Sequence, residues 1–166
     1  MNVINKKIEN AFNGQLNEEL GSAYIYLSMS AYFDSLNLGG FAHWMREQAK
    51  EEVDHAMKFF QHITDRNGRV VLTALKAPKT NWKSPLDAFQ DALKHEEYIS
   101  DCINKLVELA QKEKDHPAFE FLQWFVDEQV EEEKSVGEMV EKLKLAGDHP
   151  AGLLFLDAEA GKRKGE

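Results

Sequence analysis

A chain of 166 residues with a formal net charge of −9 has the size of one domain, and we expect a single domain over residues 1–166. Its composition, 43% hydrophobic and 30% charged with four prolines, excludes a disordered chain and favours a helical protein with solvated outer faces. The acidic charge argues against nucleic-acid binding, because no basic stripe is present to neutralise phosphates.

The N-terminal residues include no apolar run long enough for a signal peptide, and no segment approaches the length of a membrane-spanning helix. The single cysteine, Cys102, leaves no disulfide to form within the chain. From these features we expect a cytoplasmic protein that does not associate with a membrane.

Hydrophobic residues recur with helical periodicity in four long segments and one short one. The first two are separated by a short break at residues 36–40, which predicts antiparallel neighbours. The third begins at the cap signal Ser84-Pro85, the fourth follows Asp115-His116-Pro117, and Gly147 is its expected stop. The predicted helices cover about residues 5–34, 39–67, 85–112, 117–146 and 151–161.

A long connection, residues 69–83, joins the second and third predicted helices. Fifteen extended residues reach roughly 50 Å, whereas a helix of about 28 residues is about 42 Å long. The connection can therefore travel the whole bundle, which allows these two helices to run parallel. Four long helices with short, long and short connections predict an all-α protein: a four-helix bundle with one long crossover connection and a short C-terminal fifth helix.

Each long helix has an acid near its midpoint, in line with the apolar residues that face the core. At about 100° per residue, Glu19 is in line with Phe12 on the first helix, for example. On the second helix His55 lies one turn beyond the aligned acid, on the same side. Because the midpoints of packed helices coincide, one layer of the bundle is predicted to contain Glu19, Glu52, His55, Glu96 and Glu132.

The fourth helix contains the octet DEQVEEEK at residues 127–134, with five acids in eight positions. When Glu128 is taken as the zero of this helix, several apolar residues fall within about 60° of it, and Glu131 and Glu132 fall in the same sector. Three of the five acids are therefore expected to interrupt a core-facing stripe.

Buried acids of this kind require a cation, because an ionised carboxylate without a partner is costly to bury. No lysine or arginine falls near the middle of the four stripes, so the cation is expected from outside. Carboxylates with one neutral imidazole suit iron or manganese better than structural zinc, and the ligand count is enough for two ions. A lone buried glutamate is more often a protonated core acid, but acids at matching depth on all four helices indicate a metal centre.

Three further features follow from the same patterns. Tyr26, on the Glu19 stripe, is either a plain core residue or a phenol that hydrogen-bonds a ligand carboxylate. The apolar run at residues 153–156 cannot be buried by a short terminal helix alone, so it is expected to dock elsewhere, for example on other subunits. The remaining histidines are expected on the surface or at helix ends: His43, His62, His95, His116 and His149.

The motifs of the chain resemble those of the prokaryotic non-haem ferritins over its whole length. They are N-E-E-L at 17–20, E-E-V-D-H at 51–55, K-H-E at 94–96, F-L-Q-W-F at 121–125, D-E-Q-V-E-E-E-K at 127–134 and L-F-L-D at 154–157. The resemblance implies a ferritin-like fold and a ferroxidase that oxidises Fe(II) with O2 or H2O2. It also implies iron storage, as ferric oxyhydroxide mineral inside a hollow homo-oligomeric cage of 24 subunits.

The resemblance further implies residue roles in a di-iron ferroxidase centre. Glu52 bridges the two iron ions; Glu19 and His55 complete one site, and Glu96 and Glu132 complete the other. Gln129 is implied to lie beside the second ion, and Tyr26 beside the pair. The catalytic set implied in this way is Glu19, Glu52, His55, Glu96, Glu132, Tyr26 and Gln129.

A third iron site on the inner side of the bundle is also implied, with the ligands Glu51, Glu128, Glu131 and Glu132. Haem is not expected. The symmetric di-iron proteins, which include the haem-containing bacterioferritins, have a second E-x-x-H on the fourth helix, where this chain reads Glu128-Gln-Val-Glu131. Animal ferritins place acids along the three-fold channel, whereas Phe119 and Leu122 occupy those positions here. The iron entry route therefore cannot be transferred from them.

Two other functions compete with iron storage. A di-iron oxidase or peroxidase of the same bundle fold would store nothing, but the fifth helix and the missing electron-transfer cysteines count against it. A miniature ferritin-like cage that coats DNA would build its iron site between subunits and commonly lacks the last helix. The acidic charge also disfavours DNA as a partner.

Overall fold

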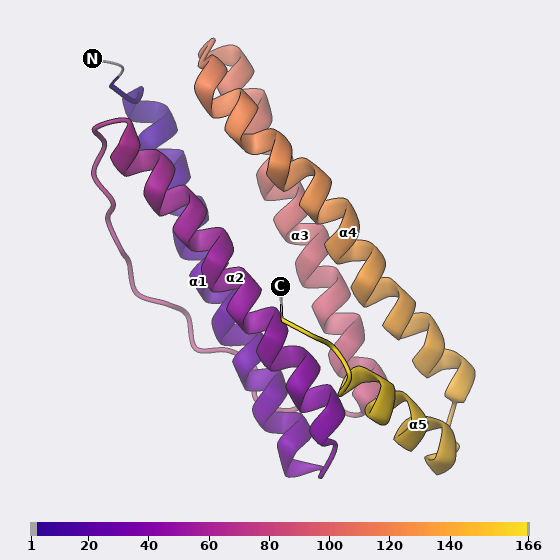
Figure 1. Cartoon of the computed structure of the whole chain (residues 1–166). Helices are drawn as coiled ribbons and strands as arrows, with labels where there is room; N and C mark the ends of the chain where they lie inside the picture. The colour runs from indigo at the N-terminus through magenta and orange to yellow at the C-terminus, as the bar shows by residue number, and fades with distance from the viewer. Residues whose placement is uncertain (1–2, 166) are drawn as a thin grey trace.

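The computed structural model of the chain describes residues 3–165, so positions 1–2 and 166 of the expected single domain lie outside the described residues. Four long helices form an all-α bundle, and a short fifth helix lies across one end (Figure 1). The predicted fold class is confirmed. None of the helices in the described part is long and apolar enough to cross a membrane. The helices are α1 Lys6–Ser35, α2 Gly39–Asp65, α3 Pro85–Lys112, α4 His116–Ala146 and α5 Pro150–Ala160.

Local capping sets most of the helix ends, which lie within two residues of their predicted positions. The Ser84 side chain accepts a hydrogen bond from the Asp87 backbone at 3.1 Å and so caps α3. Asp115 caps α4, and Gly147 ends it with a φ of +56°, a conformation that favours glycine. α2 stops at Asp65, before the predicted 67, because Asn67 takes a φ of +56° and turns the chain out of the helix.

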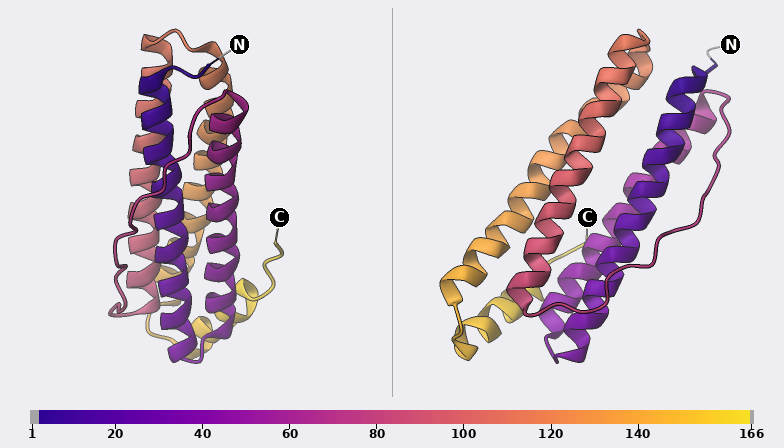
Figure 2. Two further views of the ribbon diagram at one scale, coloured as in Figure 1. Left: turned by 90° about the vertical axis from the view of Figure 1, so that its left-hand side faces the viewer. Right: turned by 180° about the vertical axis from the view of Figure 1, so that it is seen from behind.

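The crossover, residues 66–84, runs along the outer side of α1 from one end of the bundle to the other (Figure 2). Two asparagines of α1 hold this extended segment by its backbone. Asn13 Oδ1 accepts from Val71 N at 2.7 Å, and Asn17 contacts both Val71 O at 3.1 Å and Thr73 N at 2.9 Å. Because the crossover returns the chain to the starting end of α2, α2 and α3 run parallel (Figure 1).

The bundle interior contains two separate apolar clusters. One includes Phe12, Phe59 and Phe125, with the last two ring centroids 4.5 Å apart. The other includes Phe33 and Phe41, whose centroids are 5.2 Å apart. On each long helix, buried polar or acidic residues lie in sequence between the members of these two clusters. The apolar core is therefore interrupted near mid-bundle by a polar layer.

The fifth helix packs against α2 and α4. It buries Leu156 and Ala160, while Leu154 and Phe155 remain 60% and 64% exposed. Half of the apolar run at residues 153–156 is thus uncovered within one chain, as its sequence led us to expect.

Candidate metal centre

The polar layer contains the five acid and imidazole ligands inferred from the sequence. α1 contributes one residue, α2 two, and α3 and α4 one each, all from near the middle of the helix. Each is at most 5% exposed, so all five are inaccessible to bulk water. They are Glu19, Glu52, His55, Glu96 and Glu132.

His55 stands between two groups of carboxylates. Glu19, Glu52 and His55 each offer a ligand atom within 4.8 Å of the others, and so do His55, Glu128 and Glu132. His55 Nδ1 lies 3.2 Å from Glu52 Oε2 and 4.0 Å from Glu19 Oε2, whereas its Nε2 lies 3.7 Å from Glu128 Oε1. Both ring nitrogens therefore face carboxylate oxygens, and each group combines carboxylates with one imidazole, a donor set that suits a divalent cation.

Glu96 lies outside those two groups and is held by neutral donors. The Tyr26 hydroxyl donates to Glu96 Oε1. Gln129 Nε2 donates to Glu96 Oε2 and to the Glu96 backbone oxygen, both at 3.2 Å. Of the two readings left open for Tyr26, the structure favours the phenol that hydrogen-bonds a carboxylate. Both Tyr26 and Gln129 thus orient the α3 carboxylate.

Buried glutamines hold the other carboxylates. Gln15 Nε2 donates to Glu19 Oε1 at 3.0 Å. Gln48 Nε2 donates to Glu52 Oε1 at 3.2 Å and to Glu132 Oε2 at 2.7 Å. Within the part of the chain that the structure describes, Glu19 Oε2 and Glu132 Oε1 are buried without a hydrogen-bond partner. Such oxygens are costly to bury, so they fit the donor set that a metal ion would complete.

Burial favours the protonated form of these carboxylates in the metal-free protein. Burial raises the pKa of Glu19, Glu52 and Glu96 above the ordinary glutamate value. Burial, together with the charges of Glu96 and Glu52, raises the pKa of Glu132 to about 9. Burial alone would lower the pKa of His55, but the adjacent carboxylates raise it to about 11. The neutral imidazole inferred from the sequence therefore requires an incoming cation to displace its proton.

The core-facing stripe of α4 is rotated from its predicted position. Its buried residues centre on Gln129 and Glu132, about 80° from Glu128 at 100° per residue. Glu128 is consequently only half-buried, and Glu131 is exposed. The prediction that Glu131 interrupts the core stripe is wrong, because this residue lies about 140° from the centre of the stripe, on the outward side of the helix.

Two glutamine partners of the carboxylates were not singled out in the sequence. Gln15 precedes Glu19 by four residues, and Gln48 precedes Glu52 by four. Residues at this spacing are neighbours on one helix face, so the repeated Q-x-x-x-E pattern could have predicted these glutamine–glutamate hydrogen bonds. Arg163 was missed for a different reason: it follows α5 and reaches α2 only through the tertiary fold, where its Nη2 lies 2.8 Å from Glu51 Oε2.

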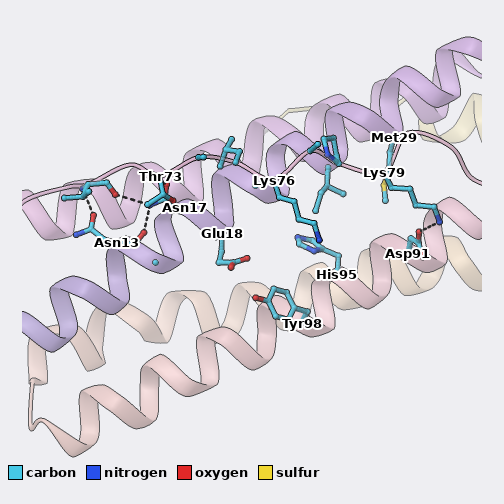
Figure 3. A pocket seen from close by; sticks show the side chains of 18 of the residues that line it. Asn13, Asn17, Glu18, Met29, Thr73, Lys76, Lys79, Asp91, His95 and Tyr98 are labelled. Atoms are coloured by element: carbon cyan, nitrogen blue, oxygen red, sulfur yellow. Dashed lines mark hydrogen bonds and ion pairs between the residues drawn. The ribbon is translucent and has the colours of Figure 1, made fainter.

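A groove of about 1000 Å³ lies outside the metal centre, between the crossover, α1 and α3 (Figure 3). Glu18, His95 and Tyr98 line it. His95 was expected on the surface, but it is largely enclosed: one ring nitrogen lies 2.7 Å from Ser22 Oγ, and burial lowers the pKa of the imidazole to about 4. This neutral histidine packs behind the centre, with its ring centroid 6.4 Å from that of Tyr26.

Comparison with known proteins identifies the family. A family model for the ferritin-like domain matches residues 9–146. The chain is 40% identical over 161 residues to a bacterial non-heme ferritin of Bacteroides fragilis, covering 97% of this chain and 100% of the relative. It is 39% identical over 155 residues to a bacterial non-heme ferritin of Campylobacter jejuni, covering 93% of both.

Solved structures of ferritins are also similar to this chain. An open pore ferritin from the hyperthermophilic archaeon Archaeoglobus fulgidus matches with a TM-score of 0.97 at 49% identity, covering 99% of this chain and 100% of that one. A closed form of the ferritin from this archaeon, engineered by site-directed mutagenesis, also has a TM-score of 0.97, at 50% identity, covering 98% and 99%. With the buried carboxylate and histidine cluster, these matches show that the chain belongs to the ferritin family, in its prokaryotic non-haem group.

Proposed function

We propose that this protein oxidises Fe(II) at a di-iron centre and stores the ferric product as oxyhydroxide mineral inside a hollow cage. The observation that carries the proposal is the buried layer of four glutamates and His55, in which Glu19 Oε2 and Glu132 Oε1 lack a hydrogen-bond partner among the described residues. The names of its relatives as bacterial non-heme ferritins support the same function.

In the proposed centre, Glu52 bridges two iron ions that enter as substrate. Glu19 and His55 complete one site, which is supported by their mutual distances within 4.8 Å. Glu96 and Glu132 complete the other, and the hydrogen bonds of Tyr26 and Gln129 to Glu96 orient that carboxylate. Two-metal sites hold their ions about 3.5 to 4 Å apart, close enough for one molecule of O2 or H2O2 to accept electrons from both.

A third iron site, with the proposed ligands Glu51, Glu128, Glu131 and Glu132, lies beside this pair. Its support is that Glu128 Oε1 lies 3.7 Å from His55 Nε2 and that Glu131 is exposed. An exposed acid next to a buried centre, such as Glu131, is suited to receive iron that leaves it. We assign this site to later steps than the first oxidation.

The cage is proposed to contain 24 copies of the chain. The support within one chain is the exposed apolar surface of α5, where Leu154 and Phe155 are more than half exposed. Large apolar side chains of this kind favour burial against another subunit. Storage depends on this assembly, because a mineral core needs an enclosed volume.

The test combines iron oxidation with particle size. Metal-free protein receives Fe(II) in air, the ferric product is followed by absorbance, and scattering measures the particle before and after loading. We expect oxidation faster than in buffer, with the iron retained in a large soluble particle. A monomeric chain, or iron that precipitates as fast as in buffer, would refute storage. Fast oxidation without retained iron would instead support the non-storage di-iron oxidase or peroxidase.

A further inference from the structure

The residues after α5 form a C-terminal arm, residues 161–165, that folds back beside α2 (Figure 1). Arg163 anchors it. Its guanidinium carbon lies 4.4 Å from the centroid of the Trp44 ring, and its Nη1 donates to the Trp44 backbone oxygen at 3.2 Å. The Arg163 backbone oxygen lies 2.7 Å from His43 Nε2. The arm is therefore attached to α2 by both its side chain and its backbone.

A single side chain, that of Gln48, links the same guanidinium to the buried carboxylates of the metal centre. Arg163 Nη2 donates to Gln48 Oε1 at 2.9 Å and to Glu51 Oε2 at 2.8 Å. Gln48 is fully buried, and its Nε2 donates to Glu52 and to Glu132. A continuous set of hydrogen bonds thus runs from the arm, through the Gln48 amide, to carboxylates of α2 and α4.

The chemistry of these groups fixes which way the Gln48 amide points. A guanidinium has only donors, so it requires the amide oxygen, and the amide nitrogen must then face the carboxylates. The reverse orientation would set Oε1 against Glu132 Oε2 and the NH2 group against the guanidinium. Arg163 therefore selects the single orientation in which Gln48 donates to both Glu52 and Glu132.

We propose that Arg163 is a positioning residue of the metal centre, which acts through Gln48 to hold the Glu52 and Glu132 carboxylates in place for metal binding. Partners of this kind, one shell beyond the ligands, orient the ligand atoms and typically change metal affinity about 10- to 100-fold when lost. The role rests on the proposed ligand set, since it concerns how those carboxylates are oriented. It links the end of the chain, beyond the fifth helix, to the chemistry at mid-bundle.

The test is Arg163→Lys in the assembled, metal-free protein. Lysine keeps the positive charge but, as a compact ammonium, cannot reproduce the planar fork that reaches Trp44 O, Gln48 and Glu51 together. Lys162→Arg is the matched control, because Lys162 is the neighbouring cation of the arm and pairs with the exposed Glu159. Cobalt(II) serves as the probe, since its visible absorption reports ligand geometry as well as binding.

We expect Arg163→Lys to weaken cobalt(II) binding about tenfold and to change the cobalt absorption bands, with Lys162→Arg unchanged. Gln48→Met should weaken binding of the cobalt pair at least as much, and Arg163→Lys should add nothing at these two sites in that background, because both act there through one amide. Glu51, which Arg163 contacts directly, belongs only to the proposed third site. Wild-type cobalt affinity and bands in Arg163→Lys, or additive losses in the double variant, would overturn the role. So would a changed particle size in Arg163→Lys, which would assign Arg163 to the packing of α5.

Failure of this inference is distinguishable from failure of the proposed function. If the wild-type protein binds no pair of cobalt ions, the ligand set itself is wrong, and with it the role of Arg163. If the wild type binds the pair and Arg163→Lys binds it equally well, only the role of the arm is wrong.

Discussion

The Asp157 side chain accepts a hydrogen bond from the backbone N–H of Phe41, with Oδ1 and N 2.8 Å apart. This contact supplies the N-terminal cap of α2 from α5, because Leu38 at the cap position of α2 has no side-chain oxygen to offer. The two helices approach so closely that a Cβ atom on Gly40 would lie 1.7 Å from the Asp157 backbone oxygen. The docking of α5 is therefore specified by both Asp157 and Gly40.

Asp157→Ala should destabilise the protein by about 1 kcal/mol, the usual effect of removing an N-cap side chain. It should also loosen α5, because the cap is one of the bonds that join this helix to α2. Denaturant unfolding and particle size are the measurements. Asp157→Asn keeps an acceptor oxygen and should remain close to wild type. Glu159→Ala, on an exposed position of the same helix, is the second control, and an equal loss there would contradict a specific cap.

A chain that ends at Asp148 should fail to form the full-size particle. The deletion removes the side chains of Leu154 and Phe155, which are more than half exposed, while the proposed ligands on all four long helices remain. Size-exclusion chromatography with light scattering measures the result. A particle of unchanged size would show that α5 is not an assembly element.

The helices of the bundle could be predicted from the sequence because most of their ends are set by local contacts. Ser84 and Asp115 bond to backbone groups three residues ahead, and Gly147 adopts the left-handed conformation itself, so no distant contact is needed. The cap of α2 is different, since Asp157 lies 116 residues from Phe41. No local sequence pattern could predict that a residue of α5 caps the N-terminus of α2.

The acid layer could be predicted from local sequence as well, because Glu19, Glu52 and Glu96 interrupt regular apolar stripes. On α4 the pattern was ambiguous, because the octet at residues 127–134 surrounds the helix with acids and the stripe centre cannot be set from them alone. The contact of Arg163 with the metal centre could not be predicted from the sequence, because its approach to Gln48 depends on the path of the arm after α5.

The metal-free protein should lose stability as pH rises from about 7 to 9. Glu132 has a pKa raised to about 9, so the folded state retains a proton that the unfolded state has lost. His55, with a pKa raised to about 11, acts in the same direction. A state that binds more protons is disfavoured as pH rises, and Glu132 alone accounts for roughly 2 kcal/mol over this window. Denaturant unfolding at each pH measures the slope.

Glu132→Gln is the variant that isolates this effect, because an amide mimics the protonated acid and cannot ionise. Its stability should fall less steeply above pH 7 than that of the wild type. The lowered pKa values of His95 and His62 act at lower pH and with the opposite sign, so they do not disturb the comparison. Parallel slopes for the two proteins would show that Glu132 already ionises freely in the metal-free fold.

Glu52→Ala and Glu131→Ala should affect different steps of iron oxidation. Glu52 is the proposed bridging ligand, and it is buried beside His55, with 3.2 Å between Oε2 and Nδ1. Its loss should abolish the fast oxidation phase, because a shared ligand is removed from both ions at once. Glu131 is exposed on the outward side of α4 and belongs only to the proposed third site. Its loss should spare the first fast phase and slow the next turnover.

Stopped-flow oxidation with two Fe(II) per subunit, followed by a second equal addition, separates these cases. Asp127→Ala, at an exposed position of the same acidic octet, controls for the loss of one negative charge near the centre. If Glu131→Ala abolishes the first phase as completely as Glu52→Ala, the division between a di-iron pair and a third site fails. Glu131 would then have to be reassigned as a ligand of the di-iron pair.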